Sequence, residues 1–144
     1  MRRFLALAAF TVSLLTAADV ADMSGSWVLN VTRSKWHDAA KPSSGRIVID
    51  HHEPKLKYES TITLADGKTQ TFNFDGDIDG KDHGGLTATR LSPVSMLLSK
   101  TEQGKTEEIS NTVTRDGKHL IRRITTTAGE DKLVWTELYD KEDR

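Results

Sequence analysis

The stretch "KLKYESTITL", residues 55–64, decides the fold of this chain. Leu56, Tyr58, Ile62 and Leu64 occupy every second position, apart from Ser60, and lysine, glutamate or threonine occupies the positions between them. An alternation with a period of two places apolar side chains on one face of an extended strand and polar side chains on the other. The stretch therefore predicts a half-buried strand with one face in water.

The same strand-like pattern recurs on both sides of this stretch. Turn signals separate several of the segments: "ADGK" at 65–68, "RDGK" at 115–118 and "AGED" at 128–131, and Asp-Gly is a strong hairpin signal. Only "RSKWHDAAK", residues 33–41, has the composition for a turn or two of helix, which Pro42 would end. The eight further predicted strands are "SWVLNV" (26–31), "GRIVIDHH" (45–52), "TQTFNFD" (69–75), "LTATRL" (86–91), "SMLLSKT" (95–101), "EISNTVT" (108–114), "HLIRRITTT" (119–127) and "KLVWTELYD" (132–140).

Short strands joined by short turns are typical of a β-sandwich or a β-barrel. We expect an all-β fold, a single up-and-down antiparallel barrel of roughly eight to ten strands, because closure removes the unpaired edges of a sheet. A barrel of that size encloses a small ligand, whereas a sandwich built from the same strands fills itself with side chains. The sandwich is the alternative that the pattern leaves open.

The first residues resemble an export signal. Arg2 and Arg3 precede an uncharged apolar stretch, and Thr16 and Ala18 provide the small residues of a cleavage site. We predict a signal peptide at residues 1–18, a barrel domain at 19–144, and a periplasmic or extracellular location. The alternative is a retained anchor helix, which the shortness of the apolar run disfavours, since a membrane span needs about 20 apolar residues.

Composition excludes several classes of function. The formal charge is −1 for the whole chain and would be −3 after loss of the two signal arginines, so no basic field is expected to attract nucleic acid or an anionic membrane. The chain has no cysteine, which excludes a disulfide framework, a thiolate nucleophile and the lipid-modified cysteine of a lipoprotein.

Several motifs in order carry a family resemblance. "MSGSWVLNVTRSKW" (23–36) contains Gly-x-Trp at residues 25–27 and Ser-Lys-aromatic at residues 34–36, and "DGKDH" (79–83), "RDGKHL" (115–120) and "VWTELYDK" (134–141) follow. Together they resemble the secreted bacterial lipocalin-like proteins of the calycin superfamily. The resemblance implies a barrel of eight to ten strands with an apolar cavity and no catalytic machinery. It also implies that Trp27 closes one barrel end and packs on a basic residue, Arg122 or Arg123.

One position departs from the related intracellular fatty-acid-binding proteins. Their chains end in an Arg-x-Tyr that clamps a carboxylate inside the barrel, and the matching tail here is "TELYDK" (136–141), with Glu137 in place of the arginine. An acid at this position repels a fatty-acid head group. The resemblance therefore does not extend to the fatty-acid clamp.

The acidic stretch "FDGDIDGKDHGG", residues 74–85, begins like an EF-hand calcium loop. The twelfth position of such a loop is a bidentate glutamate, and when the loop is counted from Asp75, Leu86 occupies that position. We therefore interpret the stretch as a solvated turn, with a weak calcium site as the lesser alternative. His51 and His52 are neighbours on a strand and point to opposite faces, so they do not chelate one ion together. We predict no metal and no cofactor, although three histidines converging in space is an alternative that the sequence leaves open.

Candidate catalytic groups are equally sparse. No Gly-x-Ser-x-Gly elbow, no cysteine and no Ser-x-x-Lys before a helix occurs in the chain. No two carboxylates are marked out as a catalytic pair. We predict no catalytic residues and a protein that is not an enzyme. An enzyme built on the barrel is the least favoured alternative, because it requires at least two titratable side chains that converge in the cavity.

Polar residues that share a face with apolar ones are the best candidates for a binding site. Arg90 alternates with Leu86 and Ala88, and Asn111 alternates with Ile109 and Val113. One of Arg122 and Arg123 must point inward because neighbours on a strand alternate. An arginine inside a barrel either pairs with an acid, such as Glu137 or Glu107, or awaits an anionic ligand.

These considerations give a predicted ligand-binding set and a predicted function. The expected function is that of an exported binding protein for a small apolar or amphipathic molecule, and the alternative is a filled barrel that acts as a structural or protein-interaction module of the cell envelope. The predicted lining residues are Tyr58, Phe72, Phe74, Arg90, Leu97, Ile109 and Asn111.

Overall fold

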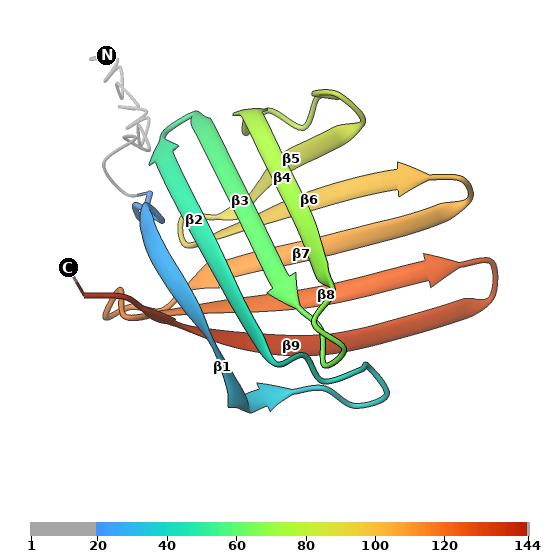
Figure 1. The fold of residues 1–144 in the computed structure, drawn as a ribbon. Helices are drawn as coiled ribbons and strands as arrows, with labels where there is room; N and C mark the ends of the chain where they lie inside the picture. Colours follow the sequence, from blue (N-terminus) through green and yellow to red (C-terminus); the bar gives the residue numbers. More distant parts are fainter. Residues whose placement is uncertain (1–19, 144) are drawn as a thin grey trace, which may run out of the picture.

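A computed structural model describes residues 20–143 and shows one sheet of antiparallel strands (Figure 1). Each of the nine segments predicted as a strand forms one. The strands are β1 (Gly25–Lys35), β2 (Ser44–His52), β3 (Lys55–Thr63), β4 (Thr69–Asp77), β5 (Leu86–Ser92), β6 (Ser95–Glu102), β7 (Lys105–Val113), β8 (His119–Ala128) and β9 (Asp131–Lys141). The predicted signal peptide, residues 1–18, lies outside the described residues.

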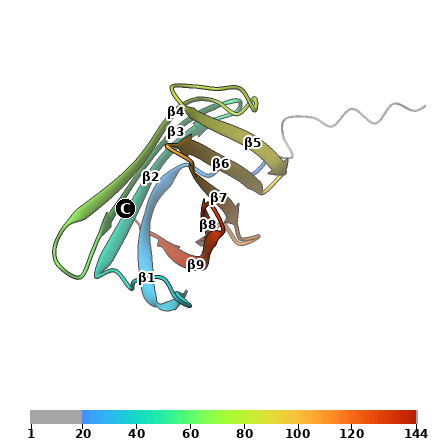
Figure 2. The ribbon, with the colours of Figure 1, turned by 90° about the vertical axis from the view of Figure 1, so that its right-hand side faces the viewer.

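The sheet curls into a nearly closed up-and-down barrel. Its strand order is β4-β3-β2-β1-β9-β8-β7-β6-β5. Strands that follow one another in the chain are therefore neighbours in the sheet except β4 and β5, and the first strand, β1, pairs with the last, β9. Figure 2 shows β2, β3 and β4 as one wall facing β6, β7 and β8. Strands β4 and β5 are the two ends of the sheet and have no ladder between them. The barrel prediction is confirmed, and the sandwich alternative is wrong because a single continuous sheet supplies both walls.

Two hairpins use the same turn chemistry. In the β3–β4 turn, Asp66 Oδ1 accepts a hydrogen bond from the backbone N–H of Lys68 at 2.9 Å, and in the β7–β8 turn Asp116 Oδ1 accepts one from Lys118 at 2.9 Å. The glycine between aspartate and lysine has φ of +85° at residue 67 and +72° at residue 117. Glycine adopts this left-handed conformation without a steric penalty, which explains why Asp-Gly-Lys specifies both turns.

The helical turn considered for residues 33–41 does not form. Strand β1 continues to Lys35, and a tight turn follows in which the N–H of Ala39 donates to Trp36 O at 2.9 Å. His37 takes a positive φ of 51°, which is incompatible with a right-handed helix. The segment 36–42 instead belongs to the loop, residues 36–43, that connects β1 to β2 at one end of the barrel.

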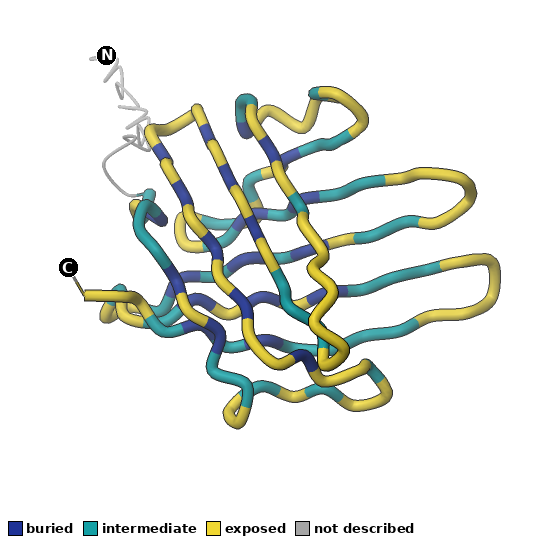
Figure 3. The backbone as a smooth tube through the Cα atoms, in the orientation of Figure 1, coloured by how far each residue is buried: buried dark blue, intermediate teal, exposed yellow. Residues whose placement is uncertain are grey.

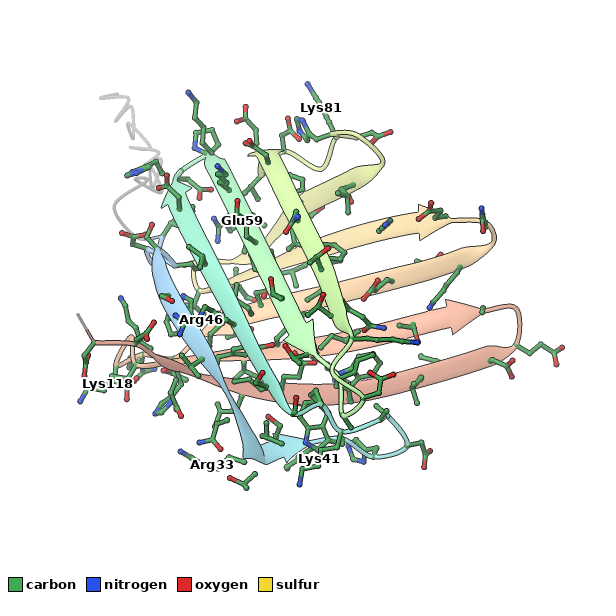
Figure 4. The ribbon with its side chains drawn as sticks, viewed as in Figure 1. Arg33, Lys41, Arg46, Glu59, Lys81 and Lys118 are labelled. Carbon is green, nitrogen blue, oxygen red and sulfur yellow. The ribbon has the colours of Figure 1, made fainter. Side chains whose placement is uncertain are left out.

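Burial follows the predicted alternation. Along β2 and along β3 up to Glu59, every second residue is buried and the residues between are exposed (Figure 3). Arg46 and Glu59 belong to the exposed face of these strands (Figure 4). The largest fully buried side chains form the core, and they are Trp27, Tyr58, Tyr139, Phe74, Met23, Ile47, Leu56, Met96, Leu98, Ile109, Leu120 and Ile124.

Trp27 lies fully buried at the barrel end that the N-terminal segment covers. Its indole Nε1 donates to Met23 O at 3.1 Å, and Met23 is itself fully buried. The expected basic partner from β8 is wrong: Lys141 Nζ lies 5.5 Å from the Trp27 ring centre, whereas Arg122 lies over Tyr139 at 5.3 Å. The reason is register, since Trp27 pairs directly with Lys141 across the β1–β9 ladder.

The acidic stretch is part strand and part loop: its first four residues, 74–77, belong to β4, and residues 78–85 form the connection from β4 to β5. Asp79 Oδ1 lies 2.9 Å from the backbone N–H of Lys81 and 2.9 Å from His83 Nε2, and Asp82 Oδ1 accepts a bond from Gly85 at 2.6 Å. The hydrogen bond from His83 lowers the pKa of Asp79. Within residues 20–143, no group of three or more His, Cys, Asp or Glu side chains is placed to hold a metal ion. In the same part of the chain, no helix is both long and apolar enough to cross a membrane.

Candidate ligand-binding site

A cavity of about 560 Å³ lies at the barrel end away from Trp27. One wall is the inner face of β3 and β4, the opposite wall is the inner face of β7, β8 and β9, and the 36–42 loop borders it. The hairpins β6–β7 and β8–β9 extend past β4 beside this region (Figure 1). The lining residues are Trp36, Ala39, Ala40, Pro42, Ser60, Ile62, Leu64, Gln70, Thr71, Phe72, Lys105, Glu107, Ile109, Arg122, Ile124, Thr126, Leu133, Trp135 and Glu137.

Three aromatic side chains contribute from three separate elements. Trp36 comes from the loop after β1, Phe72 from β4 and Trp135 from β9. All three are only partly buried and pack against the core cluster rather than within it. Partly exposed aromatic rings around a concave space are a common feature of sites that bind small molecules.

A buried ion pair forms the polar part of the cavity wall. Arg122 and Glu137 are direct neighbours across the β8–β9 ladder, and both side chains are 4 % exposed. Arg122 Nε and Nη2 each lie 2.7 Å from the same carboxylate oxygen, Glu137 Oε1, so a single charged oxygen accepts two charge-assisted hydrogen bonds. The inward arginine is therefore Arg122, and its partner is Glu137, one of the two acids predicted from the sequence.

Neighbouring polar groups complete the hydrogen bonding of this pair. Arg122 Nη1 donates to Ser60 Oγ at 2.6 Å and to Tyr58 Oη at 3.3 Å. The Tyr58 hydroxyl in turn donates to Asn111 Oδ1 at 2.9 Å, and Asn111 donates to Ile109 O at 3.2 Å. The network thus ties β8 to β3 and β7 across the interior of the barrel.

The electrostatics keep the network in one protonation state. Burial raises the pKa of the Tyr58 and Tyr139 hydroxyls, so both remain neutral donors. Burial alone would lower the pKa of Arg122, but Tyr58, Tyr139 and Glu137 hold that pKa above its ordinary value. The arginine is a permanent cation, and Glu137 supplies the anion that neutralises it.

Four of the seven predicted binding residues lie at the cavity or against it. Phe72 and Ile109 line it directly. Tyr58 and Asn111 lie behind the lining and support Arg122 through their hydrogen bonds.

The other three lie elsewhere. Phe74 is buried in the core, where its ring and the His83 ring are nearly perpendicular and their centroids lie 5.8 Å apart. Leu97 lies between the buried Met96 and Leu98 on β6, so its side chain is on the opposite, outer face of the sheet. Placing Leu97 on the inner face required a register for β6 that is wrong by one residue, and such a shift exchanges the two faces of a strand.

Arg90 points inward as predicted but does not line the cavity. Its Nη2 bonds to Glu53 in the β2–β3 turn, and Nη2 also lies 3.4 Å from His51 Nε2. Its Nε and Nη1 are buried and have no hydrogen-bond partner among residues 20–143. The predicted alternative of an arginine paired with an acid is what the structure shows, with Glu53 as the acid.

Sequence reasoning missed the two tryptophans of the cavity. Trp135 is two residues before Glu137 on the same strand face, and its indole Nε1 donates to Glu137 Oε2 at 2.7 Å. Because residues two apart on a strand share a face, the inward position expected for Glu137 was enough to predict that Trp135 also points inward. Trp36 had no such signal, because a loop position has no face until the loop is folded.

Comparison with known proteins identifies the fold. No family model and no curated protein sequence matches the chain. Among solved structures, a fatty-acid-binding protein of Schistosoma mansoni in complex with arachidonic acid has a TM-score of 0.53 at 13 % identity, over 84 % of this chain and 96 % of that one. A mutant of the fluorescent protein UnaG gives 0.51 at 13 % identity, over 82 % and 94 %. Lipocalin 12 from rat epididymis gives 0.51 at 11 % identity, over 88 % and 68 %. The chain has the barrel fold of the lipocalins and fatty-acid-binding proteins.

Proposed function

We propose that this protein is an exported binding protein for a small apolar or amphipathic molecule. The observation that carries the proposal is the cavity of about 560 Å³, which is bordered by Trp36, Phe72 and Trp135 and whose buried charges are already paired. Sites for small molecules are mostly apolar, have a few fixed polar groups and have volumes of roughly 300–1,000 Å³. The export part rests on the charged and apolar pattern of residues 1–18.

The fold comparison supports the same proposal. One of the similar structures is, by its own description, a fatty-acid-binding protein with arachidonic acid bound. The alternative function, a filled barrel acting as a structural or interaction module, requires an interior without space for a ligand. The size of the cavity argues against that alternative.

A dye titration tests the binding proposal. Nile red is uncharged and becomes fluorescent in apolar surroundings, so its emission should rise when it enters the cavity of the purified protein. Trp36→Ala removes one aromatic wall outside the core, and we expect it to weaken dye binding about tenfold, since removing contact worth about 1.4 kcal/mol has that effect. Val48→Ala, on the outer face of β2, is the matched control and should leave binding unchanged.

Two outcomes would count against the proposal. One is the absence of any emission change at dye concentrations well above those at which apolar pockets fill. The other is a Trp36→Ala variant that binds as tightly as the natural chain. Native mass spectrometry of freshly purified protein adds an independent measurement, because a retained ligand should appear as a mass above that of the polypeptide.

A further inference from the structure

The charges of the cavity wall cancel. The lining contains two cations, Lys105 and Arg122, and two anions, Glu107 and Glu137. The deep pair is in direct contact, and Lys105 and Glu107 lie on the inner face of β7 toward the hairpin end. A ligand that enters this space therefore meets no net charge to compensate a charge of its own.

The deep pair has little bonding capacity left for a charged head group. Glu137 Oε1 accepts from Arg122 Nε and Nη2 at 2.7 Å and from the Tyr139 hydroxyl at 2.8 Å. Its Oε2 accepts from Trp135 Nε1 at 2.7 Å. A carboxylate has about four acceptor sites, so its capacity is close to filled. An incoming anion would have to replace Glu137 as the partner of Arg122 and leave Glu137 buried and unpaired, which is costly.

Uncharged polar groups remain for recognition. Ser60 Oγ accepts a bond from Arg122 Nη1, and its own hydroxyl hydrogen has no acceptor within the described part of the chain. Gln70, on the same face of β4 as Phe72, and Thr126, on the same face of β8 as Arg122, add an amide and a hydroxyl to the lining. These groups suit a neutral oxygen, such as that of an alcohol, ester or ketone, and do not supply the charge that a carboxylate or an amine requires.

We propose that the cavity selects an uncharged amphipathic ligand, an apolar body with a neutral oxygen function, and that the Arg122–Glu137 pair is the determinant of this selection. The proposal rests on the binding function proposed above and names the class of ligand. It distinguishes this barrel from one in which a buried arginine is left free to receive an acid.

Competition against Nile red tests the ligand class with three molecules of equal chain length: 1-decanol, decanoate and decyltrimethylammonium. The natural chain should release the dye with 1-decanol at lower concentration than with either ion. Because an alcohol partitions more readily into any apolar pocket, the decisive measurement is the change in selectivity between variants. Glu137→Gln frees the Arg122 cation, and we expect it to improve decanoate affinity relative to 1-decanol about tenfold or more, with no gain for the ammonium ion.

Two further variants complete the test. Glu107→Gln removes the same charge nearer the hairpin end and should change decanoate selectivity far less than Glu137→Gln. The double variant Arg122→Gln with Glu137→Gln removes both charges and should keep the preference for 1-decanol. A gain in decanoate affinity in this double variant would contradict the proposal even if Glu137→Gln alone fails to fold. If all variants share one selectivity, or if the natural chain prefers decanoate, the ligand-class proposal is wrong while binding stands. If none of the molecules releases the dye, or the dye does not bind, the binding function itself fails.

Discussion

At the scale of single residues, the Arg122–Glu137 pair is the most consequential contact in the molecule. Strand alternation sends Arg122 inward and Arg123 outward, and the β8–β9 register places Glu137 directly opposite Arg122. Burying either charge alone is unfavourable, because the interior does not replace the lost hydration. The two residues are therefore interdependent, and changing one changes the environment of the other.

This interdependence predicts the effect of Arg122→Met. Removing the cation leaves Glu137 buried without its partner, and we expect the free energy of unfolding to fall by about 3–5 kcal/mol. Adding Glu137→Leu should restore most of that loss, since a buried ion pair replaced by apolar groups is often neutral in stability. Urea unfolding of both variants measures the difference.

Arg46→Met is the matched control for this prediction. Arg46 bonds to Glu142 on the exposed outer face, where ion pairs contribute little because water and salt screen them. Its urea midpoint should stay close to that of the natural chain. A single variant of Arg122 that is as stable as this control would contradict the assignment of a buried, interdependent pair.

At the scale of elements, a second polar cluster joins three separate segments at the other barrel end. His51 on β2 accepts a bond from the backbone N–H of Met23 at its Nδ1 (3.1 Å), and its Nε2 lies 2.6 Å from Glu53. Glu53 also accepts a hydrogen bond from Arg90 on β5, and Asp22 Oδ1 lies 3.9 Å from His51 Nδ1. The N-terminal segment, the β2–β3 turn and β5 are thus held by one carboxylate and its partners.

The cluster predicts a pH dependence of stability. Partial burial raises the pKa of Glu53, but hydrogen bonds from His51 and Arg90 outweigh it and hold that pKa below its usual value near 4.5. A carboxyl whose pKa is lower in the folded state stabilises the fold above the pKa it has when unfolded, and this contribution is lost as the pH falls through the folded value. The contribution of Glu53 to the free energy of unfolding should therefore be fully present at pH 7 and should decline below about pH 4.5.

Glu53→Gln isolates this contribution. At pH 7 the variant should be less stable than the natural chain by about 1 kcal/mol, a value typical of a partly exposed charged pair. The difference should shrink toward pH 3, because Glu53 itself becomes protonated there. Urea titrations between pH 3 and pH 7 give both numbers, and a difference that stays constant or grows in acid would refute the role assigned to Glu53.

At the scale of the whole molecule, the barrel has one weak seam. Strands β4 and β5 each pair with a single neighbour, and the nearest links between them come from the connecting loop, where the N–H of Gly80 donates to Ala88 O at 2.8 Å. Every other strand has a neighbour on both sides. Backbone groups that lack a partner strand are open to water and to local unfolding.

Amide hydrogen exchange should reveal this seam. We expect the amides of β4 to exchange on average at least about tenfold faster than those of β8, which lies between β7 and β9. Within β4, the amides that are hydrogen-bonded to β3 should exchange more slowly than the amides that face the seam. Equal protection of β4 and β8 would indicate that the barrel closes fully in solution.

The sequence by itself determined the local structure of this protein. Period-two alternation located all nine strands, and Asp-Gly-Lys at residues 66–68 and 116–118 marked two of the hairpins. Both signals act between residues close together in the chain, so they can be recognised without the fold. The same alternation placed Tyr58, Asn111 and one arginine of β8 in the interior, because each strand face follows from its own residues.

Only the tertiary structure decided where the ligand site lies. Alternation assigns a residue to a face but not to a position along the barrel, so it did not separate Phe72, at the cavity, from Phe74, in the core. Nor did it show that Arg90 meets Glu53 while Arg122 meets Glu137. Those outcomes depend on pairing between segments far apart in the chain, on the closure of β1 against β9, and on the path of the 36–42 loop that brings Trp36 to the cavity. Such contacts form only when the whole sheet curls, and no local pattern encodes them.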